Sequence, residues 1–134
     1  MKLIDKIEQE QMKKEVTNFN IGDTVSINTR VKEGDKERIQ KFQGIVISRK
    51  GRGMNELFTV RRISYGEGVE RVFPLHSPYI ESISVENQGK VRRSRLFYLR
   101  GRKGAMEVKQ DKNAAAANKA AAKAKKEAAA AAKA

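Results

Sequence analysis

Hydrophobic and polar residues alternate along much of the chain up to residue 86. In residues 25–31, every second position is apolar or β-branched, which is the two-residue period of a strand with one buried face. Similar patterns predict four more strands, at residues 43–48, 57–63, 69–73 and 80–85. Turns containing glycine or proline separate these segments, and no helical pattern lies between them. The chain is therefore predicted to be mainly β, a small SH3-like barrel, with an OB-type barrel as the alternative.

The region before the first strand has a different pattern. Residues 2–16 are rich in Lys, Glu, Gln and Met, and Leu3, Ile4, Ile7 and Met12 are spaced loosely like one face of a helix. This pattern predicts a short amphipathic helix that packs on the domain. We therefore divide the chain into an N-terminal helical region (1–18), the barrel (19–108) and a tail (109–134).

The tail is compositionally distinct from the barrel. From Ala114 onward, 14 of 21 residues are alanine and most of the others are lysine. Alanine favours helix, but an isolated helix of this length is only marginally stable in water. The tail is predicted to be disordered or transiently helical. The alternative is an auxiliary RNA-contacting tail that folds on binding.

Charge is distributed unevenly over the chain. Residues 1–86 contain 15 basic and 13 acidic residues, a net charge of +2, whereas residues 87–134 contain 14 basic and 3 acidic residues, a net charge of +11. Such a concentration of positive charge indicates a polyanionic partner, because each neutralised phosphate releases condensed counterions. There is no cysteine, and no apolar stretch long enough for a signal peptide or a membrane helix. We expect a soluble, cytoplasmic protein.

The densest positive charge lies in the basic segment, residues 89–104, which contains no acidic residue. Arginine predominates there, and its planar guanidinium suits forked contacts to phosphate. We interpret the segment as a strand-like extension with a basic start, an apolar middle and a basic end. Phe97 and Tyr98 are assigned to the core, with base stacking as the alternative. The candidate RNA-binding residues of this segment are Lys90, Arg92, Arg93, Arg95, Arg100, Arg102 and Lys103.

A second basic cluster lies near a predicted hairpin tip that contains Gly51 and Gly53. It adds Arg49, Lys50, Arg52, Arg61 and Arg62 to the candidate RNA contacts, although a charged surface turn would have the same composition. Residues 32–44 mix charges of both signs and are predicted to form an exposed loop with ion pairs, in which Arg38 is a further candidate contact.

No active site is indicated by the sequence. His76 is the only histidine, and there is no cysteine to complete a zinc site or a catalytic dyad with it. The glycines at 51–53 and 66–68 lack the spacing of a dinucleotide site, and there is no phosphate-binding loop. We expect no enzymatic activity, metal or cofactor. His76 and the adjacent Ser77 are assigned to structure or RNA contact.

Four stretches together resemble one known family: KEGDKERIQKFQGIVISRKGRG (32–53), FTVRRIS (58–64), VERVFPLHSP (69–78) and GKVRRSRLFYLRGRKG (89–104). In this order they are similar to the bacterial large-subunit ribosomal protein nineteen family, and the likeness runs from about residue 3 to residue 104. Lys90 to Arg100 match the basic extension of that family, Arg49 to Gly53 match its loop tip, and His76 and Ser77 lie in its FPLHSP turn. The chain departs from the family at Gln43, at Glu67 and after Gly104.

The resemblance implies an SH3-like barrel with an N-terminal helix. It also implies a place on the intersubunit face of the large ribosomal subunit, with contacts to large-subunit ribosomal RNA and to neighbouring ribosomal proteins. The resemblance further implies that the chain helps to form a bridge to small-subunit ribosomal RNA.

The leading hypothesis is therefore a non-enzymatic ribosomal protein that binds ribosomal RNA by charge neutralisation and shape fit. One rival is a free nucleic-acid chaperone with a histone-like tail, which would bind duplexes and single strands alike. Another is a protein-interaction module with an SH3-type peptide groove. That groove would need exposed aromatic residues, and the chain has only eight aromatic residues and no tryptophan.

Overall fold

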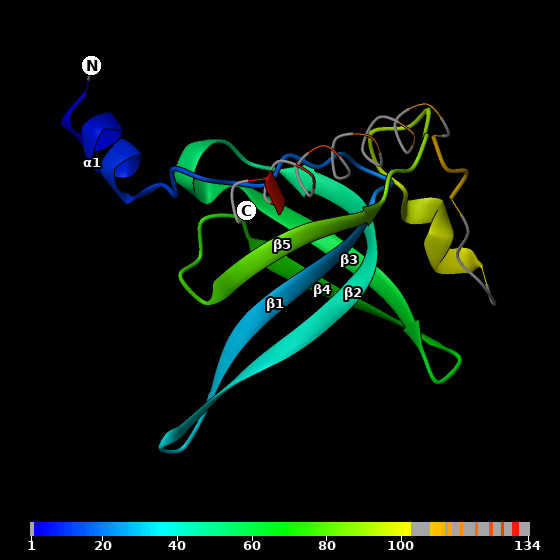
Figure 1. Ribbon diagram of the computed structural model, residues 1–134, viewed down its shortest axis with the longest axis horizontal. Coiled ribbons are helices and arrows are strands. Elements are labelled where there is room, and N and C mark those ends of the chain that lie inside the picture. Colours follow the sequence, from blue (N-terminus) through cyan, green and yellow to red (C-terminus); the bar gives the residue numbers. More distant parts are fainter. Residues whose placement is uncertain are drawn as a thin grey trace.

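The computed structural model describes residues 2–102 and 108–111, together with single residues of the tail (113, 116, 120, 124, 127, 130 and 131). The described chain begins with a short helix, α1 (Leu3–Gln11), and continues into a sheet (Figure 1). The strands are β1 (Thr24–Glu33), β2 (Lys36–Lys50), β3 (Leu57–Ser64), β4 (Glu67–Pro74) and β5 (Ile80–Asn87). The 3-10 helices are η1 (Gly53–Asn55) and η2 (Phe97–Gly101). The predicted mainly β fold is confirmed, and each predicted strand overlaps an observed one.

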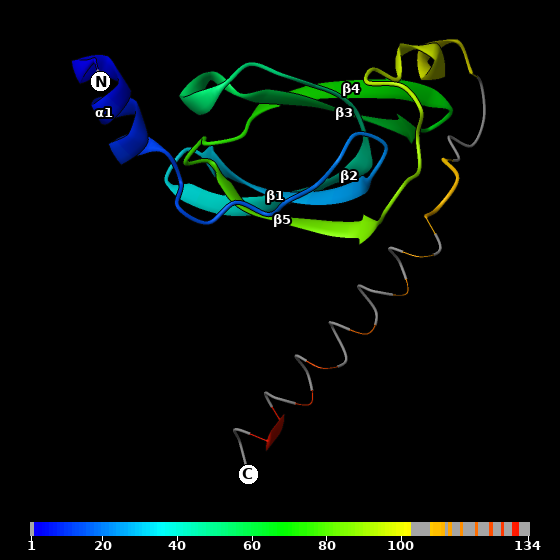
Figure 2. The same cartoon turned by 90° about the horizontal axis from the view of Figure 1, so that it is seen from above.

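The strands form one antiparallel sheet in the order β4-β3-β2-β1-β5. The sheet bends into two layers, with β3 and β4 in one and β1 and β5 in the other (Figure 2). The long strand β2 joins the layers, because its first part pairs with β1 as far as Ile45 and its second part pairs with β3 from Ile45 onward. The described strands β4 and β5 are the two edges of the sheet, so the predicted barrel is partly open.

Glycine is needed where β2 bends toward β3. A Cβ atom added to Gly44 would lie 2.5 Å from the backbone oxygen of Arg61, a separation that a side chain could not adopt without moving the strand. The register between β2 and β3 also shifts between Val46 and Ser48, and such an irregularity sharpens the bend of a sheet. The bend is therefore built into the sequence of β2.

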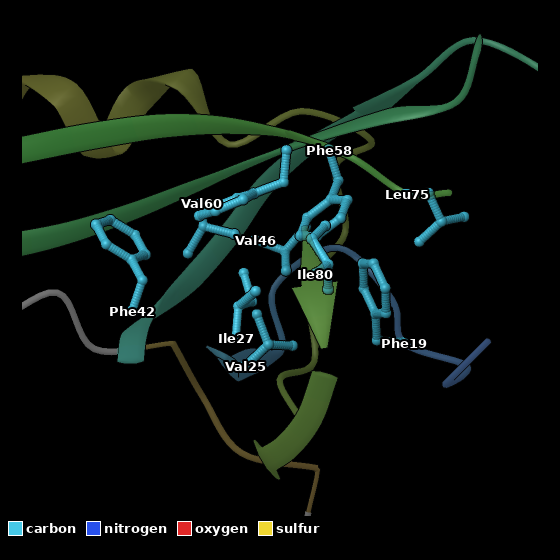
Figure 3. Packing of buried hydrophobic residues seen from close by; sticks show 10 residues of the cluster. Phe19, Val25, Ile27, Phe42, Val46, Phe58, Val60, Leu75 and Ile80 are labelled. Atoms are coloured by element: carbon cyan, nitrogen blue, oxygen red, sulfur yellow. The ribbon is translucent and has the colours of Figure 1, made fainter. Parts of the chain in front are cut away.

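The main core fills the space between the two layers (Figure 3). Alternate residues of the strands point into it, such as Val25 and Ile27 of β1 and Phe58 and Val60 of β3, all no more than 1% exposed. Phe19, which precedes β1, packs against Phe58 with ring centroids 4.9 Å apart in an edge-to-face arrangement. The two-residue period of the sequence thus identifies the residues that hold the layers together.

The prediction of an exposed loop over residues 32–44 was wrong for most of that stretch. Residues 36–43 are the first half of β2 and pair with β1 across a two-residue turn at Gly34, where φ is +60°. This end of the β1–β2 hairpin extends away from the rest of the sheet (Figure 1). Both faces are therefore largely exposed to water, so the alternating pattern of a half-buried strand is missing. Cross-strand ion pairs such as Arg38–Glu33, at 2.8 Å, take its place.

The N-terminal helix is shorter than the predicted 2–16, and its contact with the domain is small. None of its residues is buried, and Leu3 and Ile4 are 78% and 66% exposed. It lies at one end of the molecule, beside η1 (Figure 2). The chain after the helix is held more firmly, since the Lys13 Nζ donates a hydrogen bond of 2.6 Å to the Ile80 carbonyl oxygen.

Residues 109–111 of the tail form backbone contacts with residues 88–90. Its described residues from Asn113 onward have helical backbone and are exposed. Within the part of the chain that the structure describes, no helix is long and apolar enough to cross a membrane.

Candidate nucleic-acid interface

The start of the basic segment is fixed to the domain through Asp23. This carboxylate is 2% exposed. Its Oδ1 accepts a hydrogen bond of 3.0 Å from the Gly89 N–H, and its Oδ2 accepts one of 2.8 Å from the Asn20 N–H. Gly22 lies directly under the segment, and a Cβ atom there would be 2.7 Å from Val91 Cγ1. A buried acceptor with two backbone donors therefore fixes where the basic segment begins.

A second strand-like contact supports the same end. Gly89 and Gln110 form an antiparallel bridge. On either side of it, the Lys90 N–H donates to the Lys109 carbonyl at 2.7 Å and the Asp111 N–H donates to the Gln88 carbonyl at 3.0 Å. Residues 108–111 therefore return to pair with the start of the basic segment.

The far end of the segment is anchored by two leucines. Leu96 and Leu99 are 0% and 1% exposed and pack with Ile45 and Ile47 in a second, smaller core. Since Val46 points into the main core, its neighbours Ile45 and Ile47 point to the opposite face of β2. The Leu96 N–H also donates a hydrogen bond of 2.8 Å to the Ile47 carbonyl. The segment is thus seated on the outer face of the sheet.

The conformation of this end differs from the predicted strand-like extension. Residues 97–101 form the 3-10 helix η2, in which positions three apart lie on the same side. Leu96 and Leu99 consequently face the sheet, while Phe97 and Tyr98 face outward and are 41% and 39% exposed. The assignment of these two aromatic residues to the core was therefore wrong.

Between the two anchors lies a short exposed stretch, residues 92–95, which we call the arginine loop. Arg92, Arg93 and Arg95 are all exposed. None of them forms an ion pair with a residue that the structure describes, and the same is true of Lys90 and Arg102. Lys103, another predicted contact, lies outside the described residues. The fold thus fixes the ends of the loop and leaves its cations open to a partner.

Other predicted RNA contacts are engaged within the protein. Arg61, whose side chain is 11% exposed, lies 2.9 Å from Glu70, and Arg100 binds both oxygens of the same carboxylate at 2.8 Å. The Arg100 hydrogen bond is the main cause that holds the pKa of Glu70 below its ordinary value, with Arg61 adding to it. Glu70 therefore links η2 to β3 and β4 through two arginines.

Arg49 and Arg62 also serve the fold. Arg49 pairs with Glu56, donates a hydrogen bond of 3.1 Å to the Phe19 carbonyl and lies over the Phe19 ring. Arg62 lies over the Phe42 ring at 4.6 Å. Lys50 and Arg52 of the same predicted cluster are exposed at the tip between β2 and η1. Only part of the second cluster is therefore free to meet another molecule.

His76 and Ser77 have partners in the turn before β5. The Nδ1 of His76 accepts a hydrogen bond of 3.2 Å from the Lys13 N–H, and the Ser77 Oγ accepts one of 3.3 Å from the Tyr79 N–H. Both residues therefore form contacts within the protein, which is one of the two roles assigned to them from the sequence. In the described residues there is no group of three or more His, Cys, Asp or Glu side chains that could hold a metal ion.

The Glu70 link leads to a prediction about stability. Replacing Glu70 with Gln removes the counter-charge of the nearly buried Arg61, and we expect the free energy of unfolding to fall by about 1–3 kcal/mol at pH 7. Because the pKa of Glu70 is lowered in the folded state, its stabilisation is present above the unfolded pKa and is lost as the pH falls through the folded pKa. Urea unfolding between about pH 5 and pH 3 should therefore show a shallower pH dependence in Glu70→Gln than in the wild type.

The matched control is Glu33→Gln, which breaks an ion pair whose side chains are 56% and 58% exposed. Exposed pairs contribute about 0–1 kcal/mol, so this variant should behave like the wild type. An equal loss of stability in both variants would contradict the role assigned to Glu70.

These features define a class of protein: a small β domain that presents arginines from a segment anchored at both ends. A model of the ribosomal protein L19 family matches residues 2–111. The chain belongs to the ribosomal protein L19 family, whose members are structural proteins rather than enzymes.

Three curated relatives illustrate the likeness, each named large ribosomal subunit protein bL19. The one from Alkaliphilus metalliredigens is 56% identical over 115 residues, which is 84% of this chain and 98% of the relative. The one from Clostridium novyi is 57% identical over 112 residues, 83% of this chain and 97% of the relative. The one from Protochlamydia amoebophila is 58% identical over 108 residues, 80% of each chain. The family predicted from the sequence motifs is therefore confirmed.

Proposed function

We propose that this chain is a structural constituent of the large ribosomal subunit and binds ribosomal RNA through the arginine loop. It acts in the cytoplasm, within the ribosome. The observation that carries the proposal is that Arg92, Arg93 and Arg95 are exposed on a loop whose two ends are fixed to the domain. Membership of the ribosomal protein L19 family supports it.

The anchoring favours binding for an energetic reason. Ordering a loop on association costs free energy, and a loop already held at both ends has less freedom to lose. The arginines bind phosphates and release counterions, which supplies affinity without reading the sequence. Specificity then comes from the shape of folded RNA, which the rigid sheet matches in only one orientation.

We further propose that the chain helps to form a bridge to small-subunit ribosomal RNA and lies beside other large-subunit proteins. A bridging protein needs two separate surfaces for its two partners. Lys50 and Arg52 directly precede η1 and the arginine loop precedes η2, and the two 3-10 helices lie at opposite ends of the sheet (Figures 1 and 2). Two basic surfaces at opposite ends suit simultaneous contact with two RNA molecules.

Sedimentation of tagged protein from a cell lysate tests the proposal. The protein should sediment with large subunits in a sucrose gradient and should be released only as the salt concentration is raised. In low-magnesium gradients that report subunit association, the pair Lys50→Ala and Arg52→Ala should reduce association while large-subunit binding persists. The pair Arg92→Ala and Arg95→Ala should instead weaken large-subunit binding itself, because the arginine loop is the proposed contact to large-subunit RNA.

Two outcomes would contradict these proposals. Protein that stays at the top of the gradient, and in solution binds duplex and single-stranded RNA alike, would be a free nucleic-acid chaperone. If the pair Lys50→Ala and Arg52→Ala leaves subunit association unchanged, or lowers it only by abolishing large-subunit binding, the bridging role is wrong.

A further inference from the structure

We propose that Tyr98, with Arg93 and Arg102 beside it, forms a stacking site for one unpaired nucleotide of RNA. The proposal rests on the RNA-binding function proposed above and names the kind of RNA feature that this surface takes. The site lies on the exposed side of η2, next to the arginine loop.

The first observation is the exposure of an aromatic ring on a firmly held element. Tyr98 is 39% exposed, although its neighbours Leu96 and Leu99 are buried on the other side of η2. These two leucines fix the orientation of the 3-10 helix against β2, so the ring of Tyr98 is held at the surface. An aromatic ring held in this way loses little freedom when a base stacks on it.

The second observation is the charge around the ring. The Cζ atoms of Arg93 and Arg102 lie 5.3 and 5.2 Å from the ring centroid of Tyr98. These groups line an open pocket of about 420 Å³, whose lining residues are Arg92, Arg93, Leu96, Tyr98 and Arg102. A pocket of this size is in the range that holds small ligands.

The chemistry of the pocket selects a nucleotide. A base can stack on a tyrosine ring or on the plane of a guanidinium, while a second guanidinium binds the adjoining phosphate. Paired bases inside an A-form duplex are already stacked on both faces and cannot offer one to a protein. The pocket therefore suits a nucleotide in a loop, a bulge or a single strand.

The neighbouring aromatic residue shows why the site is at Tyr98. Arg100 lies over the Phe97 ring at 4.4 Å, and both of its hydrogen bonds to Glu70 hold it there. By contrast, Arg93 and Arg102 form no ion pair with any residue in the described part of the chain. They are free to move from the ring to a phosphate, whereas Arg100 is not.

Because the sequence contains no tryptophan, the fluorescence of tyrosine can be used to test the stacking site directly. The variant Tyr65→Phe with Tyr79→Phe retains Tyr98 as its single tyrosine, and the emission of Tyr98 can be followed during titration of the full-length chain. A single-stranded oligouridylate should quench this emission, and a duplex of adenylate and uridylate of the same length should not.

Affinity measurements complete the test. Tyr98→Leu should weaken binding of the single strand roughly 5- to 150-fold, the range for loss of one stacked base, and should leave duplex binding unchanged. Its dependence on salt should match that of the wild type, because no phosphate contact is lost. Tyr98→Phe should retain the affinity, and the control Phe97→Leu should change it less than about twofold.

The outcomes separate the stacking site from RNA binding itself. The stacking site is overturned if Tyr98→Leu weakens single strand and duplex equally, weakens neither, or weakens no more than Phe97→Leu. If Arg92→Ala with Arg95→Ala still lowers duplex affinity in that case, RNA binding by the arginine loop stands. A wild-type chain that binds neither RNA overturns both proposals.

Discussion

Replacing Arg92, Arg93 and Arg95 together with alanine is expected to cause the largest loss of RNA affinity of any change that leaves the fold intact. If each arginine neutralises one phosphate, the slope of log affinity against log salt concentration should become shallower by about 0.7–0.9 per contact. If the variant and the wild type bind equally well when extrapolated to 1 M salt, the loss of three contacts makes the affinity of the variant roughly 100- to 500-fold weaker at about 0.1 M salt. The measurement is filter binding or anisotropy with large-subunit ribosomal RNA at several salt concentrations.

A matched control removes the same number of charges elsewhere. Lys32, Lys36 and Lys41 lie on the β1–β2 hairpin and are exposed. Lys32 lies 3.5 Å from Glu37 and Lys41 lies 4.0 Å from Glu86. Replacement of the three lysines with alanine should change the slope by less than about one unit. If the two triple variants change affinity and slope equally, net charge rather than the anchored arginine loop explains binding.

The alternating pattern predicted the strands where one face of the sheet is buried. It located β1, β3 and β5 within a few residues because their alternate positions point toward the main core. In β4 only Phe73 is buried, and the turns with glycine and proline on either side delimited that strand. It failed over residues 36–43, where the hairpin has water on both sides and the burial that produces alternation is missing. A period of two can be read from a sequence only where one face differs from the other.

The candidate site was predictable in its location but not in its details. Charge alone identified the basic segment, since phosphate binding depends on local charge. The division between free and engaged arginines depends on partners far along the chain, such as Glu70, which lies 30 residues from Arg100. Likewise, nothing in the local sequence distinguishes the buried Leu96 and Leu99 from the exposed Phe97 and Tyr98. That difference arises from the outer face of β2, on which η2 rests.

The second large effect is expected at Leu96, an uncharged residue whose side chain belongs to the smaller core. Leu96→Ala deletes a side chain that is 0% exposed, and such deletions lower the free energy of unfolding by about 2–5 kcal/mol. The loss falls in the smaller core that fixes the arginine loop, where the Leu96 N–H also binds the Ile47 carbonyl. We therefore expect RNA affinity to fall roughly 5- to 30-fold, because fixing one residue again on binding costs about 1–2 kcal/mol.

Leu75→Ala provides the comparison that separates stability from anchoring. Leu75 is 4% exposed and belongs to the main core, away from the arginine loop. Its loss should cost a similar free energy of unfolding in urea, yet RNA affinity measured on the folded fraction should not change. Exchange of the amide hydrogen at position 96 should be faster in Leu96→Ala than in the wild type, and unchanged in Leu75→Ala. Equal affinities for the two variants would mean that the arginines bind without their anchor. A selective loss in Leu96→Ala would show that apolar packing beneath the loop contributes to binding as the charges above it do.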